Sequence, residues 1–423
     1  MKVLVVGGGG REHTLVWKLN QSPRVDKIYC APGNGGIAGD AKCVPLAADD
    51  ITGLADFAQE HKIDLTVVGP EAPLAAGIVD HFTSCGLRVF GPDARGARLE
   101  GSKVFAKEVM TKYGVLTAAY KVFQEPAAAL DFVRKLNVPC VVKVNGLAAG
   151  KGVIIAQDAA EAEDAVKLIM EERAFGEAGT FVVVEELLQG EEVSILAFTD
   201  GKAIKTLVAS QDHKRVGDGD QGLNTGGMGA YSPPPVYTED IHASVCRDIL
   251  EPVIYGLAED GIKYKGVIYA GLMLTQKGVY VLEFNCRFGD PEAQVVIPRL
   301  QTDLVDVIDA IIDERLDEVE LEWDPRPAVC VVMASSGYPG AYEKGKLITG
   351  LDQLPPGVLA FHAGTALTDG KLVSNGGRVL GITAFGATIE EAVQNVYAGV
   401  EKVNYQGMHY RRDIAHRALN KGS

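Results

Sequence analysis

The chain lacks three features that would each indicate a particular class of protein. No apolar run approaches the roughly 20 residues of a membrane-spanning helix, so we expect no membrane partner. None of the seven cysteines stands in a CxxC pair, which argues against zinc and redox sites and favours reduced thiols. Basic residues are fewer than acidic ones, and the formal net charge of −15 argues against a nucleic-acid partner.

A nucleophile with a neighbouring base is also missing, because the eight histidines show no pairing with serine or cysteine. His213 in "QDHKR" is at most a residue that lines a site. No charged and apolar leader precedes the strand-like "KVLVV", so we expect a cytoplasmic protein. A length of 423 residues with 47% hydrophobic content predicts a globular protein of several domains.

The first hundred or so residues alternate strand-like and helical stretches. The strands read "KVLVV", "KIYCA", "DLTVVG" and "RVFG", and helices are expected at 11–20 and 51–61. This alternation predicts a doubly wound parallel sheet, whose ligands sit at the edge where strands lead into helices. The loops at that edge are "GGGGREH", "APGNGG", "VGPEAPL" and "FGPDARGARLEGSK".

The loop "GGGGREH" only partly fits a dinucleotide fingerprint. Gly7 and Gly9 match its first two glycines, but Glu12 occupies the third glycine position. The second strand ends in "YCAPG", without a carboxylate to hold a ribose, so NAD is not expected. Backbone amides at the helix start, with Arg11 beside them, suit the phosphate of a sugar phosphate. The alternative is that these glycines only permit a tight turn.

The stretch "VVKVNGLAAGKGVIIA" places glycines and a lysine between two β-branched runs. It is not a P-loop, because only three residues separate Gly146 from Gly150 and Gly152 stands where a hydroxyl should follow Lys151. A strand, a glycine-rich loop and a returning strand predict a hairpin that closes over a nucleotide as a lid. We expect residues 145–152 to be mobile without nucleotide and ordered with it. The alternative is an ordinary glycine-rich turn with a solvated lysine.

The segment from Gly101 to about Asp324 carries a second set of features. Lys103 begins a helix and Lys143 lies in the strand before the lid, although either lysine alone could simply be solvated. The stretch "FVVVEELLQGEEVSILAF" predicts a strand ending at Glu185, a connector, and a strand starting near Glu192. Such a hinge offers backbone groups to an adenine edge, while Glu192 can accept hydrogen bonds from ribose hydroxyls.

The strand "GVYVLEFN" places two oxygen donors on one face. Side chains alternate along a strand, so Glu283 and Asn285 point the same way and suit a Mg²⁺ that bridges phosphates. The alternative is a polar pair at a strand end. Arg287 and Asp290 follow in a tight loop that could orient a second substrate.

These motifs together resemble a known family. The lysine pair, the glycine-rich lid, "VEELLQGEE" and the Glu-x-Asn strand resemble the ATP-grasp superfamily. The stretches "GGGGREH", "VGPEAPL", "GLAAGKGV", "SQDHKRVGDGDQGLNTGGMGAYSP", "EFNCRFGDPE" and "NGGRVL" resemble, more narrowly, the phosphoribosylamine–glycine ligase (GAR synthetase) family. Two departures are Asn145 where "KADG" is expected and Leu223 in place of a proline. They leave details of the lid and loop open, and remove no group with an assigned role.

The resemblance implies a ligase of purine biosynthesis that joins glycine to 5-phosphoribosylamine and splits ATP to ADP and phosphate through a glycyl phosphate. It implies ATP-binding residues Lys103, Lys143, Gly150, Lys151, Glu185, Leu188 and Glu192. It implies Mg²⁺ or Mn²⁺ on Glu283 and Asn285. The substrate-binding candidates are Gly9, Gly10, Arg11, Glu12, Glu71, Asn224 and Asp290, and the catalytic candidates are Arg287, Asp212 and Lys214.

The expected fold class is α/β and α+β in three domains. They are a Rossmann-like substrate domain at 1–101, an ATP-grasp domain at 102–324 with a lid subdomain at about 120–188, and a strand-rich C-terminal domain at 325–423. The last domain would close one wall of the site and has no assigned catalytic residue. We expect a monomer or weak homo-oligomer.

Two other functions stay open at this point. A different ATP-grasp enzyme, such as a carboxylase acting on a ribonucleotide or on biotin, would share the ATP residues, but "NTGGMGAYSP" argues against it. A nucleotide-sensing module without catalysis is the second alternative, and both lysines and the metal strand argue against that one.

Overall fold

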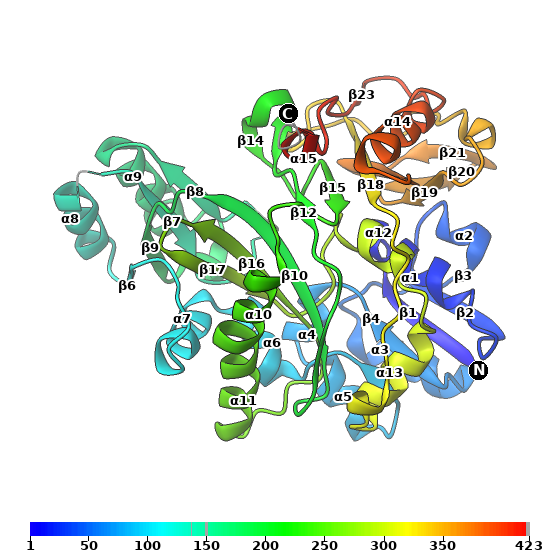
Figure 1. The fold of residues 1–423 in the computed structure, drawn as a ribbon, viewed down its shortest axis with the longest axis horizontal. Coiled ribbons are helices and arrows are strands. Elements are labelled where there is room, and N and C mark those ends of the chain that lie inside the picture. The colour runs from blue at the N-terminus through cyan, green and yellow to red at the C-terminus, as the bar shows by residue number, and fades with distance from the viewer. Residues whose placement is uncertain (137, 149–150, 420–423) are drawn as a thin grey trace.

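The computed structural model describes residues 1–136, 138–148 and 151–419. Their elements form an N-terminal sheet, a protruding lid region, a central antiparallel sheet and a C-terminal sheet (Figure 1). Among these residues, no helix combines the length and the apolar character needed to cross a bilayer.

The N-terminal region is the expected doubly wound parallel sheet, with strand order β3-β2-β1-β4-β5. Its strands are β1 (Lys2–Gly7), β2 (Lys27–Pro32), β3 (Lys42–Cys43), β4 (Leu65–Val68) and β5 (Val89–Phe90). Its helices are α1 (Gly10–Leu19), α2 (Ile37–Asp40), α3 (Ile51–His61), α4 (Glu71–Ala75), α5 (Ile78–Ser84) and α6 (Ala94–Gly101). Both faces of β1 are covered, because Leu4 and Val6 belong to one hydrophobic core and Val3 and Val5 to another.

The lid region has its own antiparallel sheet, in the order β6-β9-β7-β8. Its elements are β6 (Tyr120–Phe123), α8 (Pro126–Leu136), β7 (Cys140–Val144), β8 (Val153–Ala156), α9 (Ala159–Val166) and β9 (Val182–Glu186). The two helices share a separate core with the sheet, formed by side chains such as Val133, Val166 and Val184. The expected pairing of the strands on either side of the glycine-rich stretch is confirmed, since Lys143 lies opposite Val153.

The central sheet, in the order β11-β10-β16-β17, carries the strand of Glu283 and Asn285 at one edge. Its strands are β10 (Glu191–Thr199), β11 (Ile204–Thr206), β16 (Gly266–Thr275) and β17 (Gly278–Asn285), and the nearby helices are α7 (Lys103–Lys112), α10 (Glu239–Val245), α11 (Glu251–Glu259), α12 (Ala293–Val296) and α13 (Leu304–Ile312). The register of β16 against β17 shifts where Gly271 pairs with Glu283 and Leu272 with Val281. This bulge leaves Leu282 outside the regular pairing, next to Glu283.

The C-terminal sheet follows the order β12-β15-β18-β22-β19, with β23 also paired to β18. Its strands are β12 (Gln211–Asp212), β15 (Gly229–Ser232), β18 (Ala328–Ser335), β19 (Leu359–His362), β22 (Arg378–Phe385) and β23 (Met408–His409). The hairpin β20 (Thr365–Thr368) and β21 (Lys371–Ser374), and helices α14 (Ile389–Val400) and α15 (His416–Leu419), complete the region. Since β12 and β15 come from before residue 325, this sheet is built from two separate parts of the chain.

Candidate active site

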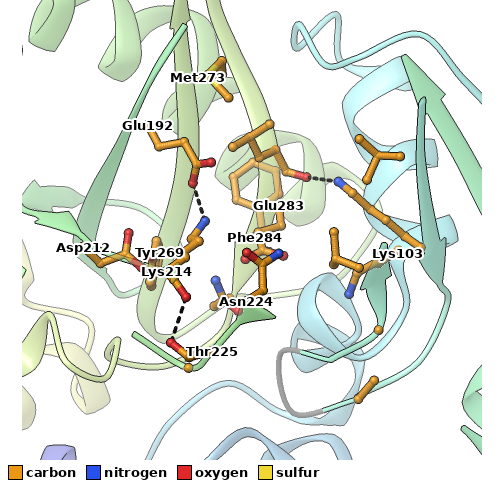
Figure 2. Close-up of a pocket in the computed structure, with 18 of the residues that line it drawn as sticks. Lys103, Glu192, Asp212, Lys214, Asn224, Thr225, Tyr269, Met273, Glu283 and Phe284 are labelled. Atoms are coloured by element: carbon orange, nitrogen blue, oxygen red, sulfur yellow. Dashed lines mark hydrogen bonds and ion pairs between the residues drawn. The ribbon is translucent and has the colours of Figure 1, made fainter. Parts of the chain in front are cut away.

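A cavity of about 550 Å³ lies where all four regions meet. Its lining includes most of the residues singled out from the sequence, and Figure 2 shows part of it. These are Arg11, Glu71, Lys103, Lys143, Glu185, Leu188, Glu192, Asp212, Lys214, Asn224, Glu283, Asn285, Arg287 and Asp290. The fold therefore brings the nucleotide, metal and catalytic candidates together.

The first glycine-rich loop is engaged within itself. Glu12 is 2% exposed, and its carboxylate accepts hydrogen bonds from the Gly9 amide and the Arg11 Nε, both at 2.6 Å. Gly10 packs so closely on Gln294 that an added Cβ would lie 2.5 Å from its Nε2. Gly9, Gly10 and Glu12 do not line the cavity, whereas Arg11 does. The glycines here permit close packing.

The lid residues assigned to ATP have different positions. Gly150 lies outside the described residues, and Lys151 is exposed and does not line the cavity. Leu147, Ala148 and Gly152 do line it, so the hairpin borders the cavity from the lid side.

Three residues, which we call the lysine cluster, form a buried ion network on β7, β9 and α7. Glu185 lies 2.9 Å from the Lys143 Nζ through Oε2 and 3.0 Å from the Lys107 Nζ through Oε1. Lys107 is 2% exposed, and burial lowers its pKa to about 8 although Glu185 opposes the shift. The sequence analysis missed Lys107, whose only signal is its place one helical turn after Lys103.

Glu283 and Asn285 line the cavity, and Phe284 between them borders it as well as belonging to the hydrophobic core. Burial opposes ionisation of Glu283, but the charges of Lys214, Lys103 and Lys143 hold the pKa of its carboxyl below the usual value. The described part of the chain contains no group of three or more His, Cys, Asp or Glu side chains that could hold a metal. An ionised carboxylate beside an amide oxygen nevertheless fits Mg²⁺, which binds through one or two carboxylates together with substrate phosphates.

Arg287 is held by two carboxylates. Its Nη2 donates to Glu100 at 2.7 Å and to Asn285 Oδ1 at 3.3 Å, and its Nε donates to Glu71 at 3.2 Å. Burial opposes the charge on Arg287, but Glu100 and Glu71 raise its pKa. Glu100, which the sequence analysis missed, also accepts from the Cys286 amide at 2.8 Å. The guanidinium therefore has a fixed orientation at the cavity wall.

The segment around Asp212 contributes a buried acid and a paired base. Asp212 is 7% exposed, and burial raises the pKa of its carboxyl to about 7. Lys214 forms an ion pair with Glu192, and its carbonyl accepts from Thr225 Oγ1 at 2.8 Å (Figure 2). His213 lies between Asp212 and Lys214 in sequence, but it is fully buried and does not line the cavity. Burial lowers the pKa of its imidazole to about 3.

The C-terminal region supplies two arginines that the sequence analysis did not assign. Arg378 on β22 lies 3.3 Å from Asp290 Oδ1 and lines the cavity. Its signal was its place in "NGGRVL". Arg417 on α15 also lines the cavity, and no motif pointed to it. The region closes a wall of the site, as the resemblance implied, and adds charge to it.

Comparisons with known proteins give consistent results along the whole chain. Residues 1–100, 101–293 and 328–417 match the N, ATP-grasp (A) and C domains of phosphoribosylglycinamide synthetase. A phosphoribosylamine–glycine ligase of Xanthomonas axonopodis pv. citri is 52% identical over 99% of this chain and 98% of its own length. The corresponding ligase of Caldanaerobacter subterraneus is 50% identical over 98% of this chain and 99% of its own length.

Two solved structures show the same architecture. The crystal structure of a phosphoribosylamine–glycine ligase from Thermotoga maritima superposes with a TM-score of 0.85 at 37% identity, covering 98% of this chain and 100% of that one. The biotin carboxylase domain of a Hydrogenobacter thermophilus 2-oxoglutarate carboxylase, in complex with MgADP and bicarbonate, gives a TM-score of 0.72 at 17% identity. It covers 97% of this chain and 91% of that one, and at this identity it shows a shared fold alone.

Proposed function

Because the chain belongs to the phosphoribosylglycinamide synthetase family, it is an ATP-dependent ligase of glycine in purine biosynthesis, and we propose that it works through a glycyl phosphate formed in the cavity. The acceptor is 5-phosphoribosylamine, and the products are glycinamide ribonucleotide, ADP and phosphate. The observation that carries this proposal is the convergence on one cavity of Lys103, Lys143, Glu185, Glu192, Glu283 and Asn285.

The chemistry requires an activated carboxylate. An amine that attacked glycine directly would have to expel oxide, so the γ-phosphoryl group of ATP is first transferred to a carboxylate oxygen. The amine then attacks the acyl carbon, and phosphate leaves with that oxygen. The protein positions the reactants and neutralises charge, which suits a cavity lined by charged side chains and lacking an assigned nucleophile.

The nucleotide lies along the lysine cluster in this proposal. Lys103 and Lys143 neutralise the phosphates, Glu185 and Leu188 border the base, and Glu192 faces the ribose. Glu283 and Asn285 hold Mg²⁺ or Mn²⁺, which when bound offsets the charge of the phosphates. Gly150 and Lys151 belong to the lid, which closes over the nucleotide and excludes water.

The two other substrates lie between Arg287, Asp290 and the Asp212 segment. Arg287 and Lys214 stabilise the negative charge that develops on glycine and the transferred phosphate. Asp212, with a pKa of about 7, accepts a proton from the attacking amine. Arg11, Glu71 and Asn224 orient the phosphoribosylamine, and Gly9, Gly10 and Glu12 support Arg11 from behind the wall.

We also propose that the enzyme works in the cytoplasm as a monomer or weak homo-oligomer. All seven cysteines are free, which suits a reducing compartment. Sedimentation across a range of concentrations tests the oligomeric state.

An isotope experiment tests the intermediate. Glycine labelled with ¹⁸O in its carboxylate should deliver one label to inorganic phosphate per turnover, with ADP as the nucleotide product. Phosphate release should also require phosphoribosylamine, because the closed lid protects the acyl phosphate until the amine attacks. Unlabelled phosphate or release of pyrophosphate would refute the intermediate. Full activity with bicarbonate in place of glycine would instead favour the carboxylase alternative.

A further inference from the structure

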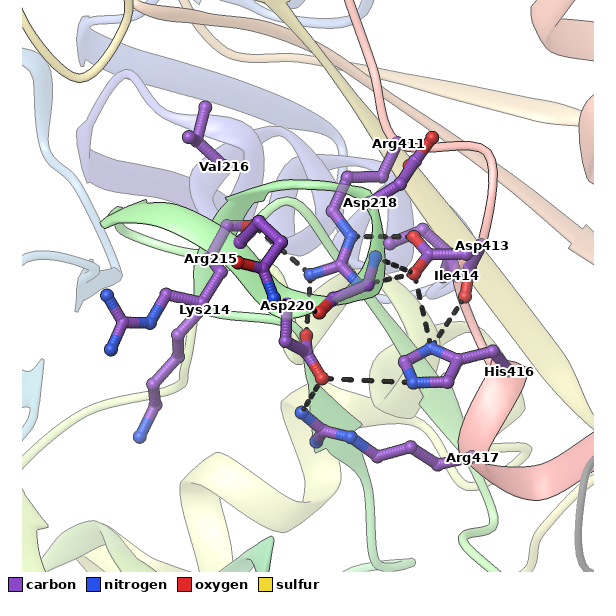
Figure 3. Close-up of polar contacts among 12 residues, drawn as sticks. Lys214, Arg215, Val216, Asp218, Asp220, Arg411, Asp413, Ile414, His416 and Arg417 are labelled. Atoms are coloured by element: carbon purple, nitrogen blue, oxygen red, sulfur yellow. Dashed lines mark hydrogen bonds and ion pairs between the residues drawn. The ribbon is translucent and has the colours of Figure 1, made fainter.

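A hairpin at the cavity is held from behind by the C-terminal segment. The hairpin consists of β13 (Arg215–Gly217) and β14 (Gln221–Asn224), and we call it the Arg215 hairpin. Arg411 is fully buried, and its Nε and Nη2 both donate to Asp413 at 2.8 Å. Its Nη1 donates to Asp220 Oδ1 at 2.8 Å and to the Arg215 carbonyl at 3.2 Å (Figure 3). The buried guanidinium therefore joins the hairpin to the end of the chain.

Three backbone contacts strengthen this junction. Asp413 accepts from the Gly219 amide, and Asp218 accepts from the Arg412 amide, both at 2.8 Å. The ring of His409 lies 2.8 Å from the Val216 carbonyl. The hairpin backbone is thus fixed at several points, so the side chains that leave its other side have a defined position.

Arg417 enters the cavity from the same cluster. Its Nη2 donates to Asp220 Oδ2 at 2.8 Å, which leaves its other nitrogens without a hydrogen-bond partner among the described residues. The charge of Arg417 contributes to lowering the pKa of the Glu192 carboxyl. Arg417 therefore acts electrostatically on the residue that is proposed to face the ribose of the nucleotide.

Arg215 is the second cation that this hairpin offers. Its Nη1 donates to the Gly222 carbonyl at 2.7 Å, and within the described part of the chain its guanidinium has no carboxylate partner. Arg11 and Arg287, by contrast, each use two or more guanidinium nitrogens in hydrogen bonds to carboxylate or backbone oxygens beside the same cavity. Arg215 and Arg417, like Arg378, therefore each keep two guanidinium nitrogens without a hydrogen-bond partner among the described residues, and these can donate to a ligand.

We propose that Arg215 and Arg417 together bind a phosphate group of a substrate, with Asp220 and Arg411 as positioning residues. A planar guanidinium offers parallel N–H donors that match phosphate oxygens, and two arginines that line one cavity suit a multiply charged phosphate. The proposal rests on the function proposed above, in which two substrates carry phosphate. The source is either the nucleotide or the sugar phosphate, and binding measurements separate the two.

The test compares the variants R417A and R215A with R412A, which removes an exposed charge from the same segment. Calorimetry with ADP measures the nucleotide arm. Competition by ribose 5-phosphate against phosphoribosylamine, with ribose as the phosphate-free control, measures the sugar arm. Each active-site variant should weaken one arm by about 10- to 100-fold, because charge-assisted hydrogen bonds are lost. R412A should leave both arms unchanged, and R417K should restore part of the loss.

The outcomes are distinct. Weaker ADP binding assigns the arginines to the nucleotide, and weaker ribose 5-phosphate competition assigns them to the sugar phosphate. Unchanged affinity in both arms, even with a lower kcat, would overturn the proposal. ADP binding is measured without turnover, so this test stays separate from the isotope experiment on the reaction.

Discussion

The cavity is bordered by two ion clusters that are built in different ways. In the lysine cluster, the pair of Glu185 and Lys143 arises from strand pairing, because Glu185 lies opposite Val141 and so diagonally next to Lys143 on the same face of the sheet. Lys107 joins this pair from α7. The cluster of Asp220, Arg411, Asp413 and Arg417, which we call the arginine cluster, instead joins two parts of the chain that are far apart in sequence. The comparison shows two ways of placing charged side chains at one site. One is the pairing of neighbouring strands, and the other is a set of ion pairs between parts of the chain that are far apart in sequence.

Glu283 is the proposed metal ligand and lies within electrostatic reach of Lys143 of the lysine cluster, so its loss should have the largest effect. Lys214, next to the arginine cluster, and Lys143 both lower the pKa of its carboxyl. Glu283→Gln should reduce turnover by about 10³-fold or more while the fold survives, because the amide cannot supply the negative charge. Steady-state kinetics with a melting curve measure this, and Glu320→Gln at an exposed site is the control. Near-normal activity over a Mg²⁺ titration would show that the pair on β17 is structural.

Breaking the arginine cluster should cost stability. Arg411→Ala leaves Asp413 and Asp220 without their buried partner, and the loss of one member of a buried ion network costs about 3 kcal/mol. Denaturant unfolding measures this change in free energy. Arg412→Ala removes an exposed neighbouring charge and should change stability by less than about 0.5 kcal/mol. Equal changes in the free energy of unfolding for the two variants would mean that the arginine cluster does not stabilise the fold.

Asp212 lies in the short strand β12 of the C-terminal sheet, which two separate parts of the chain build. We expect this residue to make the reaction rate depend on pH. Burial raises the pKa of its carboxyl to about 7, so the rate should rise as the pH passes through about 7 and Asp212 ionises. Asp212→Asn should lower kcat by about 100-fold and flatten this profile.

The same shift has a consequence for stability. A carboxyl whose pKa is higher in the folded than in the unfolded state favours the protonated fold, so stability should fall as the pH rises from about 4 to about 7. Urea unfolding at several pH values should show this slope in the wild type and lose part of it in Asp212→Asn. An unchanged slope in the variant would assign the dependence to other groups.

The lysine cluster should tolerate the loss of one member better. In Lys107→Met the side chain keeps nearly the same length but loses its charge, and Glu185 keeps Lys143 as a partner. We expect the KM for ATP to rise by about 5-fold, because Glu185 loses one of two contacts that orient it. Lys112→Met, on the exposed side of the same helix, is the control. A loss of stability as large as that of Arg411→Ala would remove the contrast between the clusters.

The sequence predicted the elements that depend on short-range patterns. Hydrophobic periodicity and turn- or cap-forming residues within a few positions predict these features. They are the starts of α3 and α7, the strands on both sides of the lid, and the shared face of Glu283 and Asn285. Glu12 could have been read differently, because a glutamate at the third position of a helix typically caps the helix start.

The remaining features depend on contacts that no local pattern encodes. Glu100 and Lys107 are ordinary helical residues until β17 and β9 pack against them. The strands β12 and β15 are too short to be detected by alternation, yet they carry central residues into the C-terminal sheet. Arg417 belongs to a short helix whose role depends on Asp220, almost two hundred positions earlier. One sequence without its relatives contains no signal for such pairs.

Arg11 and Arg417 line the same cavity although they lie near opposite ends of the sequence, and this has a consequence for how the protein is made. A ribosome adding roughly 5–20 residues per second delivers the second arginine tens of seconds after the first. During that interval Val3 and Val5 on β1 also lack the side chains of β16, α13 and β18 with which they share a core. The growing chain therefore lacks part of the lining of this cavity until α15 has been made.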